Sequence, residues 1–323
     1  MKITIISLDN WGFNKHIQDN LEKNGHTVNH IDFNKFIYKY PNILYKIYNF
    51  FLKLLFNKNL KSIHLGKKIN ELLKENKETQ DVILTIKGDF IDPSEIKKFK
   101  NNTLKSIAFF NDSAKRCPRI IKVLNCFDEV YSFEKEDCKN YNLNFAPNWI
   151  YKTNDKIKND FKYSVFNITN KDSRFGIILK IAKILNDKKI NSKILIFNKK
   201  PQKTNPYLEF ISKHISLDEV SNYIDNSQVL LDINRPGQNG LTFRVFESLG
   251  LQKKLITTNT DIHNYDFYKP NNILIIDEKK PDIPVTFFEK EYEKIPEGIF
   301  QKYTLDGWIE NVILNKSNCN NNS

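Results

Sequence analysis

The alternation of short, continuous apolar runs with segments of helical periodicity is the feature that most constrains the fold. Runs such as Val82-Ile83-Leu84 are typical of strands that are covered on both faces, as in a parallel sheet. The segments between the runs carry apolar residues at helical spacing, as Ile17 and Leu21 do. Strands that alternate with helices in this way predict an α/β fold with doubly wound parallel sheets.

Two series of strands are predicted along the chain. The first comprises residues 2–7, 27–32, 82–86, 104–110 and 129–132, and the second residues 163–168, 193–197, 228–233, 254–258 and 272–276. Helices are expected at residues 14–24, 175–186, 217–225, 241–249 and 303–314. The charged segment 151–162 has no apolar periodicity, and we predict that it is the linker between the two series.

The length of the chain sets the number of domains. At roughly 150 residues per domain, 323 residues predict two domains, each large enough to bury its own core. We therefore predict two Rossmann-like domains that face one cleft, the first over residues 1–155 and the second over residues 156–300. A helix at 301–316 and a disordered tail at 317–323 are expected to complete the chain.

The composition argues against several classes of protein. The net charge of +12 invites a nucleic-acid partner, but only five of the 50 lysine and arginine residues are arginine. Because base readers and phosphate clamps favour the planar guanidinium group, we expect no nucleic acid. The four cysteines form no Cys-x-x-Cys pair, which argues against a zinc ribbon and against an oxidised, secreted scaffold. With no apolar stretch of about twenty residues, the chain is expected to be soluble and cytoplasmic.

The apolar segment Ile43–Phe56 departs from the rest of the pattern. It predicts a helix with Lys46 and Lys53 on one stripe, and its 14 residues are too few to span a bilayer. Two interpretations stay open. The helix is buried in the N-terminal domain, or it lies on a membrane surface and makes the protein peripheral on the inner face of the plasma membrane.

The segment 231–250 is the strongest candidate for a ligand site. Its sequence predicts a strand, a loop with two glycines and then a helix. In an open α/β sheet, ligands bind outside the carboxyl ends of the strands, and a helix that begins near Gly240–Thr242 favours an anion. Arg244 and Glu247 are three residues apart and share a helix face. We interpret this as a nucleotide diphosphate site, with a solvated surface helix and an ordinary ion pair as the alternative.

In this interpretation each residue has a role. The backbone amides of Gly240 and Leu241, the Thr242 hydroxyl and the Arg244 guanidinium hold the diphosphate, and Glu247 accepts hydrogen bonds from the ribose hydroxyls. Thr169 and Lys171 follow the first strand of the second series and are expected to face the same cleft. Lys171 or Arg174 then adds positive charge near the leaving diphosphate, although Arg174 also fits a helix surface.

The same segment resembles the donor domain of group-1-type GT-B glycosyltransferases, in the form seen in lipopolysaccharide-biosynthesis and spore-maturation-type proteins. The resemblance is strong over residues 216–277 and weaker in the N-terminal half. It rests on the runs Asn234-Arg235-Pro236, Gly240-Leu241-Thr242-x-Arg244-x-Phe246-Glu247-x-Leu249-Gly250 and Lys254-Leu255-Ile256-Thr257-Thr258-Asn259. In that family the glutamate matching Glu247 binds the ribose, and the preceding loop, here with Arg235, meets the diphosphate. Asn239 stands where many retaining relatives carry an acid that contacts the donor sugar, so retention or inversion stays open.

The resemblance implies a function. It implies a hexosyltransferase that moves a sugar from a nucleotide-diphosphate donor to a hydroxyl of a cell-surface glycan or glycolipid, such as lipopolysaccharide or capsule. The donor is expected on the C-terminal domain and the acceptor on the N-terminal domain. No Asp-x-Asp motif is present, so we expect no metal and no other cofactor. A non-catalytic GT-B-like subunit that binds a nucleotide sugar or acts as a scaffold is the alternative.

An inverting enzyme also needs a general base near the acceptor hydroxyl. Asp9 and Asp112 each follow a predicted strand of the N-terminal domain, and both are candidates for that base. Lys87 follows another of these strands and is a candidate contact for phosphate or for an acidic acceptor. The alternative for each aspartate is a helix cap or a turn residue.

Overall fold

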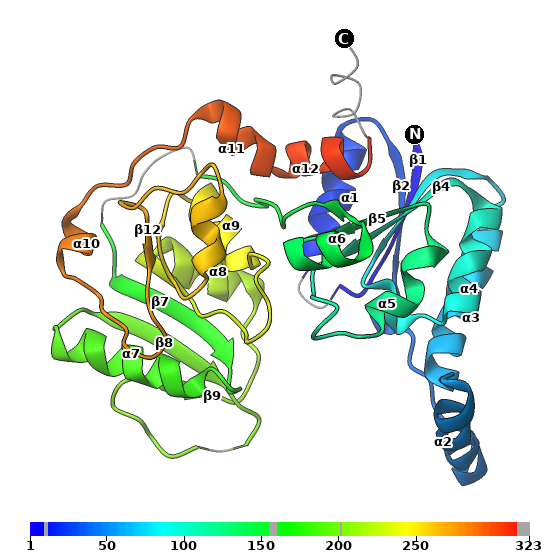
Figure 1. The fold of residues 1–323 in the computed structure, drawn as a ribbon, viewed down its shortest axis with the longest axis horizontal. Coiled ribbons are helices and arrows are strands. Elements are labelled where there is room, and N and C mark those ends of the chain that lie inside the picture. Colours follow the sequence, from blue (N-terminus) through cyan, green and yellow to red (C-terminus); the bar gives the residue numbers. More distant parts are fainter. Residues whose placement is uncertain (10–11, 155–159, 201, 315–323) are drawn as a thin grey trace. The chain divides into compact units, whose positions relative to one another are not determined.

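The computed structural model describes residues 1–9, 12–154, 160–200 and 202–314. The chain forms two compact units (Figure 1). Unit 1 combines Met1–Pro147 with Leu305–Ser323, and unit 2 is Asn148–Thr304. The change of unit therefore falls before the predicted linker 151–162, and residues from Leu305 onward are grouped with the N-terminal residues. The predicted disordered tail, 317–323, lies outside the described residues.

Unit 1 is built on a sheet of six parallel strands in the order β2-β1-β3-β4-β5-β6. The strands are β1 Lys2–Ser7, β2 Thr27–Asp32, β3 Gln80–Ile86, β4 Thr103–Phe110, β5 Glu129–Ser132 and β6 Asn144–Phe145. The helices are α1 Phe13–Lys23, α2 Ile43–Phe56, α3 Leu60–Glu75, α4 Pro93–Ile96, α5 Ile120–Val123, α6 Lys135–Tyr141 and α12 Leu305–Val312. Short 3-10 turns lie at Phe33–Lys35, Gly88–Phe90, Lys97–Asn102 and Leu124–Cys126. The apolar runs of β1, β3 and β4 are buried as the sequence predicted.

Helix α12 packs onto the sheet of unit 1. The ring of Trp308 meets the ring of Phe109 in β4 edge to face, with 5.1 Å between their centroids. Tyr131 in β5 donates its hydroxyl to the carbonyl of Asn311 at 3.3 Å. Trp308 and Phe109 are buried, so α12 completes the core of unit 1.

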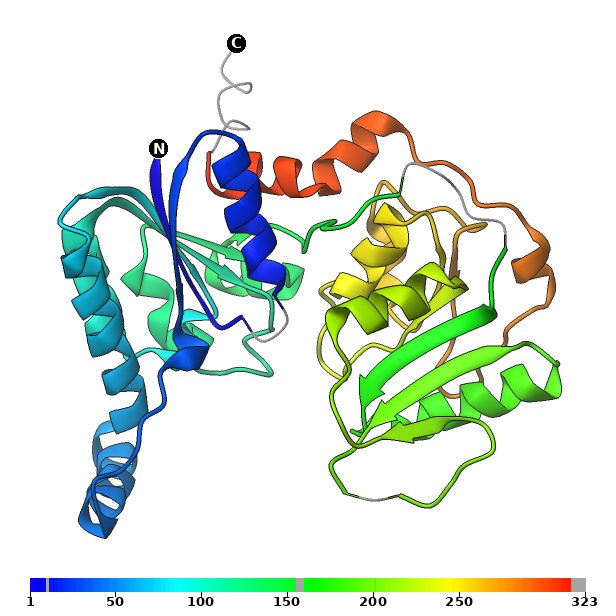
Figure 2. The ribbon, with the colours of Figure 1, turned by 180° about the vertical axis from the view of Figure 1, so that it is seen from behind.

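Unit 2 holds a second sheet of six parallel strands, in the order β12-β11-β10-β7-β8-β9. The strands are β7 Tyr163–Asn170, β8 Ser192–Phe197, β9 Glu209–Ile211, β10 Ser227–Asp232, β11 Lys254–Thr257 and β12 Ile273–Ile275. The helices are α7 Phe175–Asp187, α8 Leu217–Asp225, α9 Phe243–Gly250, α10 Thr286–Glu289 and α11 Glu297–Tyr303, with a 3-10 turn at Thr260–Asn264. Helices α8 and α9 cover one face of the sheet and α7 the other (Figure 2), so both faces of β10 are buried.

The predicted fold class is confirmed, because two parallel sheets with interleaved helices make a two-domain, Rossmann-like α/β protein. The strands at 2–7, 27–32 and 129–132 and the helix at 217–225 have the predicted ends, and the other predicted elements differ from the observed ones by at most two residues at either end. Helix α3, the short helices α4, α5, α6, α10 and α11, and the short edge strands β6 and β9 had no predicted range. Two and three residues are too few to show a period-two pattern.

Helix α2 has the predicted bounds, but the interpretation that it is buried is wrong. Large apolar side chains along its whole length are exposed, for example Leu44 (68%) and Leu54 (68%). Among the described residues, no helix is both long enough and apolar enough to cross a bilayer.

Candidate functional site

The site is built around the connection from β10 to α9 in unit 2. Strand β10 is central in its sheet, between β11 and β7, and ends at Asp232. The following loop turns at Gly237, whose φ of 74° lies in the left-handed region that favours glycine, and the amide of Gln238 closes the turn on the carbonyl of Arg235 at 3.2 Å. Thr242 then caps α9 by accepting a hydrogen bond from the amide of Arg244 at 3.2 Å. The positive end of α9 thus follows the carboxyl end of a central strand, as predicted.

Arg244 and Glu247 form a buried ion pair on α9. Nη1 of Arg244 lies 2.6 Å from Oε2 of Glu247, and the two side chains are 15% and 6% exposed. The guanidinium also lies over the ring of Phe166, 5.7 Å from its centroid. The predicted pairing is therefore present, but the alternative of a solvated surface helix is wrong, because residues 245–250 are all buried. A charged pair at this depth is retained at a desolvation cost.

Tyr151 forms a hydrogen bond with the second carboxylate oxygen of Glu247. Its hydroxyl donates to Oε1 of Glu247, and its ring lies near Phe243 at the start of α9. Burial and then the negative charge of Glu247 raise the pKa of Tyr151, so the phenol keeps its proton and remains a donor. Tyr151 was not among the predicted site residues, and no local pattern marks it, because its partner lies 96 residues further along the chain.

Gly250 explains how the segment of Tyr151 comes so close to α9. A Cβ at Gly250 would lie 2.3 Å from the carbonyl oxygen of Lys152 and 2.4 Å from a methyl of Ile150. The amide of Asn154 also donates to the carbonyl of Gly250 at 3.2 Å. The absence of a side chain at this position lets the carbonyl of Lys152 and the side chain of Ile150, on either side of Tyr151, pack directly against the end of the helix.

Asp232 is a second site residue that was not predicted. It is 7% exposed, and burial raises the pKa of its carboxyl, with a hydrogen bond from Thr242 and the charge of Arg244 opposing the shift. Its Oδ2 atom has no hydrogen-bond partner within the described part of the chain. A signal was available in the sequence, because Asp232 is the polar residue that ends the apolar run of β10.

Arg174 joins the carboxyl ends of two neighbouring strands. Its guanidinium donates to the hydroxyl of Thr169, near the carboxyl end of β7, at 2.7 Å and to the carbonyl of Ile233, just after β10, at 3.0 Å. Asp172 binds the same guanidinium at 2.7 Å and lies 3.8 Å from Arg235. The side chain of Arg174 is 12% exposed, so the expectation of a helix-surface residue is wrong.

The remaining predicted donor residues fall into two groups. Asn239 and Leu241 are held through their backbones, because Asn259 donates to the carbonyl of Asn239 and Asn148 to that of Leu241, both at 2.8 Å. Lys171 lies over the rings of Phe175 and Phe210. Its amide donates to the carbonyl of Phe197 at the end of β8, so it belongs to the β8–β9 side of the sheet rather than to the β10–α9 connection.

In unit 1 the predicted residues gather after adjacent strands of the sheet. Asp112, after β4, pairs with Lys87, after β3, at 3.0 Å and with Arg116 at 2.7 Å. Asp9, after β1, accepts a hydrogen bond from the amide of Lys15 at 3.2 Å, which is the capping role of the alternative interpretation. These residues line up at the carboxyl edge, since the strand order is β1-β3-β4.

Asp89 belongs to the same edge and was not singled out from the sequence. It is 9% exposed, and burial raises its pKa to about 6, against the positive charge of Lys87. A carboxyl that titrates near neutral pH is suited to accept or return a proton.

No group of three or more His, Cys, Asp or Glu side chains that could hold a metal ion occurs within the described ranges. The expectation of no metal and no cofactor stays a prediction.

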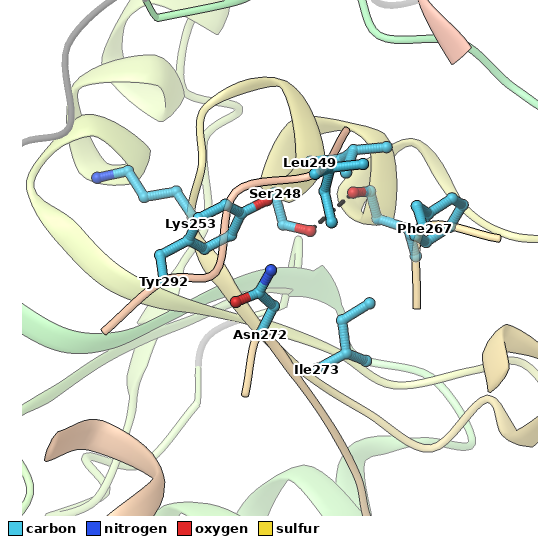
Figure 3. Close-up of a pocket in the computed structure, with 9 residues that line it drawn as sticks. Ser248, Leu249, Lys253, Phe267, Asn272, Ile273 and Tyr292 are labelled. Atoms are coloured by element: carbon cyan, nitrogen blue, oxygen red, sulfur yellow. Dashed lines mark hydrogen bonds between the residues drawn. The ribbon is translucent and has the colours of Figure 1, made fainter. Parts of the chain in front are cut away.

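The far side of α9 borders a small cavity of about 10 Å³, shown in Figure 3. Three of its polar side chains already have hydrogen-bond partners. Ser248 donates to the carbonyl of Val245 at 2.7 Å, Lys253 to that of Ser227 at 2.7 Å, and Asn272 to that of Glu293 at 2.7 Å. This cavity has room for about one water and is far smaller than the roughly 300 Å³ that small-molecule sites need, so it is a packing gap.

No family model matches the sequence, and no curated protein matches it either. Solved structures do match over the whole length. The UDP-forming α,α-trehalose-phosphate synthase from Burkholderia vietnamiensis covers 98% of this chain and 99% of its own, with a TM-score of 0.59 at 9% identity. AviGT4, a glycosyltransferase involved in avilamycin A biosynthesis, covers 100% and 99%, with a TM-score of 0.58 at 8% identity. The chain has the GT-B fold.

A third GT-B neighbour was solved with ligands. Anabaena HepE, in complex with UDP and glucose, covers 98% of this chain and 100% of its own, with a TM-score of 0.56 at 9% identity. At these identities the likeness establishes the fold, and the roles of individual residues rest on the geometry described above.

Proposed function

We propose that this GT-B protein is a glycosyltransferase that moves a sugar from a nucleotide-diphosphate donor to a hydroxyl of a cell-surface glycan such as lipopolysaccharide or capsule. The observation that carries the proposal is the start of α9 after β10, with Arg244 and Glu247 on the first turns of the helix. A helix N-terminus with a guanidinium is a site for a diphosphate. The complexes of neighbours with UDP and glucose, and with ADP and acarbose, support a nucleotide-sugar partner.

In this proposal Arg244 and the positive end of α9 stabilise the charge that develops on the departing diphosphate. Glu247 binds the ribose. Because both of its oxygens already have partners in Arg244 and Tyr151, the ribose hydroxyls would replace the Tyr151 hydroxyl. Thr169, Arg235 and the 239–242 backbone are proposed to line the same donor site, and no metal is required.

The acceptor is proposed to bind on unit 1, where Asp9 and Asp112 are the candidates for general base and Lys87 for an acidic group of the acceptor. Asp112 is held in place by Lys87 and Arg116. Asp89, with its raised pKa, joins these candidates. In an inverting reaction the base accepts the proton of the attacking hydroxyl.

A non-catalytic, nucleotide-sugar-binding subunit is the second candidate. Two observations favour it: Asn239 has no carboxyl to offer the donor sugar, and Glu247 is fully engaged by Arg244 and Tyr151. Such a protein would bind a nucleotide without turning over its sugar derivative.

The test is a thermal-shift screen of the purified chain against UDP, GDP, CMP, ADP and dTDP, with Glu247→Gln as the variant. A ligand at 100 times its dissociation constant adds about 2.7 kcal/mol to the free energy of unfolding. Glu209→Gln is the matched control, since Glu209 also forms an ion pair in unit 2, with Lys193, but at an exposed position.

We expect one nucleotide to stabilise the wild type and the control but not Glu247→Gln. Slow release of that nucleotide from its sugar derivative would then support the enzyme over the binding subunit. If no nucleotide stabilises the wild type, the site around Glu247 is refuted.

A further inference from the structure

Helix α2 presents an apolar surface that the described residues of unit 1 leave uncovered. Ten of its large apolar side chains are between 44% and 68% exposed: Ile43, Leu44, Tyr45, Ile47, Tyr48, Phe50, Phe51, Leu54, Leu55 and Phe56. Exposed apolar surface on this scale marks an interaction site in a soluble protein. In Figures 1 and 2, α2 projects beyond the end of α3, away from the sheet of unit 1.

The contacts that hold α2 use its polar side. Asn49 is the buried residue of the helix. Its amide donates to the hydroxyl of Tyr40 at 2.7 Å, and its oxygen accepts from the amide of Leu60 at 2.8 Å. A surface helix ordinarily buries its apolar face and exposes its polar one. In α2 only Asn49 is buried, and the apolar side chains are exposed together with Lys46 and Lys53, so the apolar face is available to a partner outside the unit.

The charged residues in and around α2 indicate the chemical nature of the partner. Residues 33–70 contain eight lysines and no aspartate or glutamate, although the chain has 38 acidic residues in all. Lys46 and Lys53 lie on the helix, and Lys58 and Lys61 follow it directly. A partner that fits this segment is apolar inside and negatively charged at its surface.

We propose that α2 docks on a membrane that contains anionic lipids, with its apolar side chains in the interfacial region and the lysines among the headgroups. At 1.5 Å per residue, 14 residues extend about 21 Å, short of the roughly 30 Å hydrocarbon core, so α2 lies in the interface and does not cross it. A second copy of the chain is a poorer occupant, because pairing two such segments would bring two sets of eight lysines together. Anionic headgroups instead attract each of them.

The inference goes beyond the proposed function and does not rest on it, because its test measures lipid binding alone. The full chain is floated with vesicles of phosphatidylcholine and with vesicles of an equal mixture of phosphatidylcholine and phosphatidylglycerol. Leu54→Asp is the test variant. Leu104→Asp is its matched control, since Leu104 is an exposed leucine (77%) at the start of β4 in the same unit.

The two variants change the net charge equally, so any difference between them reports insertion of α2 rather than attraction of a basic chain. We expect flotation with the anionic vesicles, a loss of about tenfold in partitioning for Leu54→Asp, and no comparable loss for Leu104→Asp. Circular dichroism verifies that both variants are folded. In addition, a tryptophan placed by Phe51→Trp should be quenched by brominated lipids.

Three outcomes would overturn the proposal. A wild type that stays in solution with both vesicle types would exclude lipid binding. Equal flotation of both variants would reduce the effect to the charge of the whole chain. Finally, a dimer in sedimentation equilibrium that Leu54→Asp dissociates would make a second copy the occupant of α2.

Discussion

Tyr151 donates its hydroxyl to the carboxylate of Glu247, and the Glu247 carboxylate at the same time pairs with Arg244. The two acceptor oxygens are thus divided between a neutral donor from a distant segment and a cation on the same helix. The arrangement satisfies a buried carboxylate without ligand, and it defines which contact a ribose must replace.

Removing the cation of this pair should be more damaging than removing both charges. Arg244→Leu leaves the buried Glu247 without its counter-charge and is expected to lower the free energy of unfolding by about 3–5 kcal/mol. The double variant Arg244→Leu/Glu247→Leu should recover much of that loss, because no charge is then stranded. Urea denaturation of both variants measures the difference. Equal losses for the single and double variants would contradict a dominant role of the stranded charge.

Tyr151→Phe separates the structural role of the hydroxyl from its effect on ligand binding. Loss of a hydrogen bond to a charged group should lower the free energy of unfolding by about 1.5–3 kcal/mol. If the ribose takes the place of the hydroxyl, the variant should show a larger thermal shift with nucleotide than the wild type does. An unchanged shift would mean that ribose and Tyr151 do not compete for Glu247.

Gly250→Ala tests the close approach of the 150–154 segment to α9. Its methyl would overlap the carbonyl of Lys152, and overpacking of this kind costs about 1–3 kcal/mol. Gly176→Ala is the control, since a Cβ there meets nothing within 4 Å and should be neutral or stabilising. Thermal unfolding of the two variants side by side gives the comparison, and equal behaviour would refute the contact.

The raised pKa of Asp89 predicts how the free energy of unfolding changes with pH. Its folded-state pKa of about 6 exceeds the reference value of 3.8, so between these values the folded state binds more protons than the unfolded state. Stability contributed by the protonated form is present below about pH 4 and is lost as the pH rises to about 6. Asp89→Asn should therefore stabilise the protein at pH 8, by an amount on the order of 3 kcal/mol, and have little effect near pH 3.5.

Urea denaturation of wild type and Asp89→Asn at both pH values measures this. If Asp89→Asn raises the free energy of unfolding by the same amount at pH 3.5 and at pH 8, burial does not hold the Asp89 carboxyl in its protonated form.

The structural features that could be predicted from the sequence are those that depend on neighbouring residues in the chain. Apolar runs such as that of β3 and the strand-loop-helix order around Thr242 are local patterns, so the two sheets and the start of α9 followed from them. Whether an apolar helix is buried depends on what lies next to it, and the composition of α2 does not contain that information. The bond from Tyr151 to Glu247 and the link from Arg174 to Ile233 join residues distant in sequence, so only the fold reveals them.

Because α12, near the C-terminal end of the chain, completes the core of unit 1, unit 2 should finish folding before unit 1 does. During synthesis, all residues of unit 2, 148–304, precede Leu305, whereas Phe109 stays uncovered until Trp308 has been made. The N-terminal unit is thus the one that finishes last, and its β4 surface is open to chaperones or to misassembly for as long as translation of unit 2 takes.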